Sequence, residues 1–282
     1  MKIASFMRSG TSSYGVLVSG GIVDLGRRIG NEYPTLRAML AGKQLDHVRE
    51  IAFGGKSDVS FDEITWLPVV PDPERIVCVG LNYRSHVSEV GRAMPTNPVV
   101  FLRLPSSQTA HLGPIVRPKV SQELDFEGEL AVIIGSSGRY IEARNAFHHI
   151  AGYSIYNDSS LRDWQKHSHQ YTAGKNFPFT GAFGPWMVTA DEIPDPTRLE
   201  LSTRVNGIVL QQGNLCDLIF RIEELISYIS CFTELSPGDV IVTGTPEGVG
   251  AQRRPPIWLQ PGDVVEVEID GIGTLKNNIV QE

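Results

Sequence analysis

Short apolar runs bounded by glycine, proline or polar residues recur along the chain after residue 72, and this pattern is typical of β-strands joined by turns. Eight such runs are predicted to be strands: Arg75–Gly80, Pro98–Leu104, Glu129–Gly135, Ile150–Asn157, Gly184–Thr189, Leu199–Val205, Asp239–Gly244 and Asp263–Ile269. Helical spacing is found in three segments of this region, which are Ser85–Val90, Glu142–Phe147 and Leu218–Cys231. Strands that do not alternate regularly with helices favour a mostly-β α+β domain over a Rossmann sheet or a TIM barrel.

The first 72 residues carry a different pattern. Gly15–Asp24 reads as a hairpin around a Ser-Gly-Gly turn, and Tyr33–Arg49 has helical periodicity. Prolines at positions 68, 71 and 73 then interrupt regular structure. We therefore expect a small N-terminal α+β domain over residues 1–72 and a larger domain over residues 73–282.

Composition narrows the class of protein. The 282 residues are 41% hydrophobic and 20% charged, which is ordinary for a globular chain. The net charge is −7, whereas nucleic-acid-binding proteins carry a broad basic surface. No run approaches the roughly 20 apolar residues of a membrane span, and the first ten residues lack the apolar stretch of a signal peptide. The three cysteines form no disulfide or zinc pattern. We expect a cytoplasmic protein that acts on a small molecule, with no nucleic-acid or membrane partner.

Three acidic residues alternate along the segment that leads into one apolar strand. Alternate residues share a face of a strand, so Asp125, Glu127 and Glu129 would repel one another. An exposed strand end explains the pattern, and so does a bound cation if a further acid such as Asp158 lies nearby. Carboxylates suit Mg²⁺, Mn²⁺ or Ca²⁺ better than Zn²⁺, and three protein ligands leave positions open for a chelating 2-oxo acid.

Other candidate groups lie outside this acidic segment. His86 and Glu89 are three residues apart, so on a helical turn they face each other as a surface ion pair or as a general base that activates water. Lys175 is either a solvated lysine or an anchor for a substrate carboxylate. The adjacent Arg162 and Asp163 are expected to form a structural ion pair.

Seven segments carry motifs in a fixed order: Val79–Glu89, Leu124–Gly135, Gly152–Gln165, Gly174-Lys175, Val205–Gly207, Pro237–Gly250 and Pro261–Gly273. Their order and spacing resemble the fumarylacetoacetate hydrolase family over about residues 73–280. The resemblance implies a mixed β-sandwich roll for the larger domain, within a mostly-β α+β chain. It also implies a homodimer.

The resemblance further implies an active site. It assigns Mg²⁺ or Mn²⁺, with Ca²⁺ as a further option, to Glu127, Glu129 and Asp158. Catalytic roles fall to His86, Glu89 and Lys175, and substrate contacts to Tyr83, Arg103, Gln165, Gly244 and Thr245. Arg103 stands where many relatives have lysine. The planar guanidinium group of arginine holds a carboxylate in a different geometry from the amine of lysine.

The expected reaction is hydrolysis of a C–C bond in an acylpyruvate or related 2,4-diketo acid, as in aromatic catabolism. His86 and Glu89 would activate water, and a metal-stabilised enolate would leave. The same metal site would also serve a decarboxylase of oxaloacetate-like acids, or a tautomerase or isomerase of a 2-oxo acid. A further alternative is a non-catalytic β-rich scaffold whose acids bind structural Ca²⁺.

Overall fold

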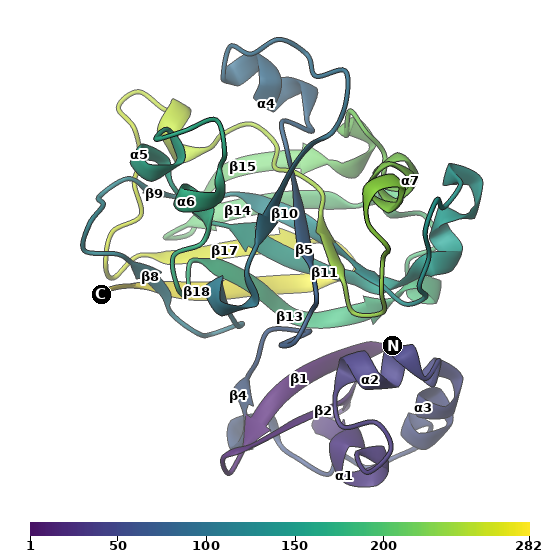
Figure 1. The fold of residues 1–282 in the computed structure, drawn as a ribbon. Coiled ribbons are helices and arrows are strands. Elements are labelled where there is room, and N and C mark those ends of the chain that lie inside the picture. Colours follow the sequence, from purple (N-terminus) through teal and green to yellow (C-terminus); the bar gives the residue numbers. More distant parts are fainter.

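The computed structural model describes all of residues 1–282, and its centre is one mixed sheet of eleven strands (Figure 1). The main path of this sheet runs β3 (Gly21–Asp24), β2 (Thr11–Val18), β1 (Lys2–Arg8), β13 (Gly181–Thr189), β11 (Ile150–Asp158), β10 (Gly128–Ile134), β16 (Val240–Val242), β5 (Ile76–Gly80) and β6 (Val99–Arg103). Two short strands complete it, since β4 (Thr65–Trp66) pairs with β1 and β7 (Gln108–Thr109) pairs with β13. Hairpin neighbours such as β10 and β11 are therefore joined in this sheet to strands that are distant in sequence, such as β16 beside β10 and β13 beside β1.

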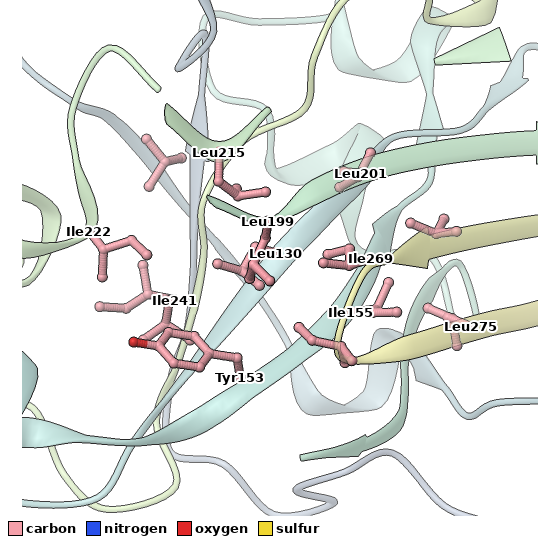
Figure 2. Close-up of a cluster of buried hydrophobic side chains, with 14 of the residues drawn as sticks. Leu130, Tyr153, Ile155, Leu199, Leu201, Leu215, Ile222, Ile241, Ile269 and Leu275 are labelled. Carbon is pink, nitrogen blue, oxygen red and sulfur yellow. The ribbon is translucent and has the colours of Figure 1, made fainter. Parts of the chain in front are cut away.

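A second sheet of five strands packs on one face of the first. Its order is β15 (Ile208–Asn214), β14 (Glu200–Val205), β17 (Val264–Ile269), β18 (Gly273–Gln281) and β8 (Ile115–Arg117). Figure 2 shows Leu130 and Ile155 of the large sheet beside Leu201 and Ile269 of the second sheet, all four buried. The predicted mixed β-sandwich fold with a mostly-β α+β composition is confirmed.

The opposite face of the large sheet carries a second core. Ala131 and Ile133 of β10 lie in this core with Met39 and Val48 of the N-terminal helices. The intervening residues of β10 face the first core, so the strand is buried on both sides, which explains its unbroken apolar sequence. Both the sheet and this core contain residues from before and after position 72. The division into domains over 1–72 and 73–282 stays a prediction.

Helices are short and lie outside the sheets. They are α1 (Leu25–Ile29), α2 (Leu36–Ala41), α3 (Leu45–Ala52), α4 (Arg84–Glu89), α5 (Arg162–Gln165), α6 (Thr172–Lys175) and α7 (Ile222–Phe232). None of them has the length and apolar character needed to cross a lipid bilayer. In Figure 1, α4 projects from the end of the large sheet opposite the N-terminal helices, with α5 and α6 to one side of it.

All eight predicted strands are present, with ends shifted by a few residues. The helical predictions need three corrections. The helix expected over Tyr33–Arg49 is two helices, because the chain turns at Lys43, whose φ is 56°. The segment predicted over Glu142–Phe147 is a 3-10 helix over Ala143–His149. Helix α7 begins at Ile222, because the backbone is still extended at its N-cap, Arg221.

Two-residue strands also split the acidic segment that the sequence suggested was continuous. Leu124–Asp125 forms β9, which pairs with Ser160–Leu161 (β12) outside the large sheet. Strand β10 begins only at Gly128. Asp125 is thus separated from the strand that carries Glu129.

Candidate active site

Three buried carboxylates converge at one end of strands β10 and β11. The antiparallel register pairs Gly128 with Asn157, and the backbone N–H of Asp158 donates to the carbonyl of Glu127 at 2.8 Å. Opposed residues share a face in such a pair, so Asp158 joins Glu127 and Glu129. One carboxylate oxygen from each of the three lies within 4.8 Å of the others. A donor set made only of carboxylates fits a hard divalent cation such as Mg²⁺ or Mn²⁺.

Asp125 does not belong to this cluster. Its carboxylate accepts from Arg162 Nε at 2.8 Å and from the backbone N–H groups of Gly250 and Ala251 at 2.7 and 3.0 Å. The alternation argument placed Asp125 on the face of Glu127 and Glu129. That prediction is wrong for Asp125, because the strand is interrupted between it and Glu127.

Three cations balance Glu127 and Asp158, and they are Lys175, Arg162 and Arg103. Lys175 Nζ lies 2.5 Å from a carboxylate oxygen of each residue, and the lysine side chain is 2% exposed. Arg162 lies 2.6 Å from Glu127. Burial opposes the charge on Lys175, but Asp158 and Glu127 outweigh burial and raise the pKa of the amine. Lys175 is therefore a protonated, buried group, and the alternative of a solvated lysine is wrong.

The expected ion pair between Arg162 and Asp163 is also wrong. Arg162 turns inward to Asp125 and Glu127, while Asp163 accepts a hydrogen bond from the Ser121 hydroxyl at 2.7 Å. The guanidinium also donates to Gln165 at 2.8 Å. Arg162 thus joins the acidic cluster to the first turn of α5.

Glu129 differs from its two neighbours because no cation bonds to it. Its one hydrogen-bond donor is the backbone N–H of Gly244, at 2.5 Å. Burial, together with the charges of Asp158 and Glu127, raises the pKa of Glu129 well above its usual range. A buried carboxylate with spare acceptor positions beside two others is suited to ligate a cation.

The predicted pairing of His86 with Glu89 on α4 is present. His86 Nδ1 lies 3.0 Å from Glu89 Oε2, and the other oxygen of Glu89 accepts from the backbone N–H of Gly248 at 2.8 Å. Fixing Nδ1 in this way leaves Nε2 as the imidazole nitrogen available for proton transfer. His86 is 7% exposed and lines the cavity that contains the three carboxylates.

This cavity has a volume of about 740 Å³, within the usual range of small-molecule sites. Gln165, Lys175 and Thr245 line it, as expected for groups that contact a substrate. Thr245 is held by its own hydroxyl, which donates to the Gly128 carbonyl at 3.0 Å. The cavity therefore contains the acidic cluster, the histidine and several polar side chains on one surface.

Three residues expected to contact substrate lie behind the cavity wall. Arg103 donates to Asp158 at 2.5 Å and to the Thr180 hydroxyl at 2.7 Å, so it holds a carboxylate of the cluster from behind. Gly244 contributes its N–H to Glu129. Tyr83 is buried at the start of α4 and its hydroxyl has no partner. These positions indicate supporting roles for Arg103 and Gly244.

Other lining residues were not proposed from the sequence. Arg92 and Gln252 reach the cavity, as do His167, His169 and Tyr171 from the segment between α5 and α6. His167 and His169 are two residues apart in the sequence, but only the fold brings this segment to the cavity that His86 of α4 also lines. Loop residues of this kind carry no periodicity that would mark them.

Residues 75–280 match the family model described as fumarylacetoacetate (FAA) hydrolase C-terminal. This chain belongs to the fumarylacetoacetate hydrolase family. Within it, the chain is 43% identical over 220 residues to oxaloacetate tautomerase FAHD2A, mitochondrial, of Bos taurus, covering 77% of this chain and 70% of that protein. It is 41% identical over 250 residues to oxaloacetate tautomerase YisK of Bacillus subtilis, covering 84% and 83%.

One solved structure similar to this chain contains a metal ion and a small 2-oxo acid. Maleylpyruvate hydrolase from Sphingobium sp. SYK-6, in complex with manganese(II) and pyruvate, superposes with a TM-score of 0.83 at 27% identity, covering 100% of this chain and 99% of that one. The names of these fumarylacetoacetate hydrolase relatives include both tautomerases and a hydrolase. The family thus fixes the fold, and the choice of reaction must be argued from the site.

Proposed function

We propose that this protein is a divalent-metal-dependent tautomerase that interconverts the keto and enol forms of oxaloacetate or a closely related 2-oxo acid. The observation that carries the proposal is the placement of His86 in the same cavity as Glu127, Glu129 and Asp158. Relatives above 40% identity named oxaloacetate tautomerase support the choice of reaction.

The residues of the chain have separate tasks in this reaction. Tautomerisation moves one proton between C3 and the C2 oxygen, so the C3–H bond breaks as the O–H bond forms, and no atom is gained or lost. His86 is the group that takes or returns the C3 proton, because Glu89 fixes its ring and leaves Nε2 free. Lys175 stays protonated beside Glu127 and Asp158 and adds positive charge at the substrate's anionic end.

Glu127, Glu129 and Asp158 would hold the cation. When bound, a divalent cation supplies positive charge that lowers the free energy of the negative charge developing on the substrate oxygen. Mn²⁺ and Mg²⁺ are the proposed ions, and the manganese in the maleylpyruvate hydrolase structure supports the first. Gln165 and Thr245 contribute hydrogen-bonding groups to the cavity wall.

Hydrolysis of a C–C bond was the first expectation from the sequence, and the comparisons favour the tautomerase alternative instead. Hydrolysis needs a water molecule held between His86 and a second carbonyl of the substrate. Tautomerisation needs only the base and the charged cluster, both of which the cavity holds. The two relatives named for tautomerisation are also more similar in sequence than the maleylpyruvate hydrolase.

The test is an assay of enol-to-keto conversion of oxaloacetate by the Mn²⁺-loaded protein, followed by ultraviolet absorbance. Release of CO₂ and cleavage of an acylpyruvate are measured in parallel. We expect tautomerisation to be the fastest of the three, and substitution of His86 by alanine to lower its kcat by about 10²- to 10⁴-fold while Mn²⁺ binding is retained. Acylpyruvate cleavage with a higher kcat/KM than tautomerisation would overturn the proposal in favour of the hydrolase.

Two further properties stay predictions. A homodimer is expected from the family resemblance, and sedimentation velocity would test it. A cytoplasmic location is expected from the sequence, and fractionation of cells that express the protein would test it.

A further inference from the structure

The mouth of the active-site cavity is cationic, in contrast to its acidic floor. The lining residues at the floor, including Glu127, Glu129 and Asp158, are buried. The exposed lining residues are Arg92, Lys166, His167, Ser168, His169 and Gln252, and none of them is acidic. The mouth therefore offers positive charge and hydrogen-bond donors in a protein whose net charge is −7.

Arg92 is the one arginine or lysine of this lining without a carboxylate partner. Arg162 and Lys175 are bound to the acidic cluster, and Lys166 Nζ lies 3.8 Å from Glu123. No Asp or Glu oxygen lies within 4.0 Å of the Arg92 guanidinium. Its charge is thus available for an anion.

The backbone holds Arg92 close to the catalytic helix. Gly91 adopts φ +63° just beyond Val90, the C-cap of α4, and the N–H of Arg92 donates to the carbonyl of Val87 at 3.1 Å. This turn directs the chain back beside the helix that carries His86, so Arg92 and His86 reach the same cavity from one segment. His167 and His169 line the cavity from the connection between α5 and α6.

We infer that Arg92 binds a second carboxylate at the far end of the substrate, and that this site selects 2-oxo dicarboxylic acids over 2-oxo monocarboxylic acids. The inference rests on the proposed function in one respect, that the 2-oxo acid end lies at the acidic floor. A guanidinium forms two parallel hydrogen bonds to a carboxylate, which gives both charge and orientation. The volume of about 740 Å³ accommodates acids longer than oxaloacetate.

The test compares two acids that differ only at the far end. 2-Oxoglutarate and 2-oxopentanoate share five carbons and the 2-oxo acid group, and calorimetry measures the Kd of each for the Mn²⁺-loaded full chain. We expect the dicarboxylate to bind about 10- to 100-fold more tightly. In Arg92→Gln this ratio falls to near one, while the Kd of 2-oxopentanoate is unchanged. Arg92→Lys restores part of the ratio.

Arg84→Gln is the matched control, because Arg84 is exposed on α4, the helix that precedes Arg92, has no ion pair and does not line the cavity. It should keep the full ratio. A wild-type ratio near one, a ratio unchanged in Arg92→Gln, or equal weakening of both acids in that variant would each overturn the inference. Exchange of C3 protons in D₂O, followed by NMR, tests the proposed function separately. Preference for the dicarboxylate without any exchange would reject the tautomerase and keep the role of Arg92.

Discussion

The ion pair between Arg103 and Asp158 should be far more important to stability than surface pairs of the same length. The Arg103 and Asp158 side chains are 0% and 1% exposed, and their closest atoms are 2.5 Å apart. Replacing Arg103 by methionine leaves a buried carboxylate with one partner fewer, a change that typically costs about 3–5 kcal/mol. Because Asp158 keeps its contact with Lys175, we expect a loss near the lower end, about 3 kcal/mol.

Arg204→Met provides the comparison. Arg204 also lies 2.5 Å from its partner, Glu268, but the two side chains are 31% and 39% exposed. Solvent screening limits such a pair to about 1 kcal/mol or less. The free energy of unfolding of both variants is measured by urea titration in EDTA, with tryptophan fluorescence as the signal. Equal losses in the two variants would refute the argument that burial makes the Arg103 pair structurally important.

Three other changes test separate parts of the structure. Gly128→Ala should destabilise the fold by about 1–3 kcal/mol and weaken Mn²⁺ binding, because an added Cβ would lie 2.2 Å from Thr203 Oγ1. Urea titration measures the stability and calorimetry measures Mn²⁺ binding, and a variant as stable as the wild type would contradict the close packing at Gly128. Removal of metal with EDTA should abolish activity. Adding Mn²⁺ at 100 times its Kd should raise the free energy of unfolding by about 2.7 kcal/mol, and an unchanged melting curve would count against a metal centre. Burial and the charge of Lys276 lower the pKa of His111 from 6.5 to about 4, so the unfolded chain binds this proton more readily and stability falls as the pH drops from 6.5 towards 4. The loss is about 2 kcal/mol after allowance for solvent, and urea titrations across this range should show a smaller loss in His111→Gln if the reasoning holds.

Local patterns in the sequence predicted the strands but not their neighbours. The apolar run of β10 is explained by burial on both faces, and its identity as a strand followed from its composition and length. Its pairing with β11 and β16 depends on chain segments up to about a hundred residues away, which no local pattern encodes. The same limit explains why the predicted helix begins at Leu218, four residues before α7. The extended residues just before the helix are also apolar, so hydrophobic spacing did not mark where the helix starts.

The candidate site was predictable where chemistry lies within one motif. Glu127, Glu129 and the pair of His86 and Glu89 are each close in sequence, so spacing was informative. The partners of Arg162 were not, because its neighbour Asp163 was the obvious acid and the true ones lie 35 and 37 residues away. The partner of a buried charge is the group that the fold brings next to it, and position in the sequence alone does not identify that group.

One glycine-rich segment supports several carboxylates at once. The backbone N–H groups of Gly244, Gly248 and Gly250 donate to Glu129, Glu89 and Asp125 in turn. Any shift in the path of residues 244–250 would displace a proposed metal ligand and the orientation of the proposed base together. A substitution that moves this segment would therefore disturb binding and proton transfer at once, whereas a substitution among the exposed residues at the cavity mouth leaves these backbone donors in place.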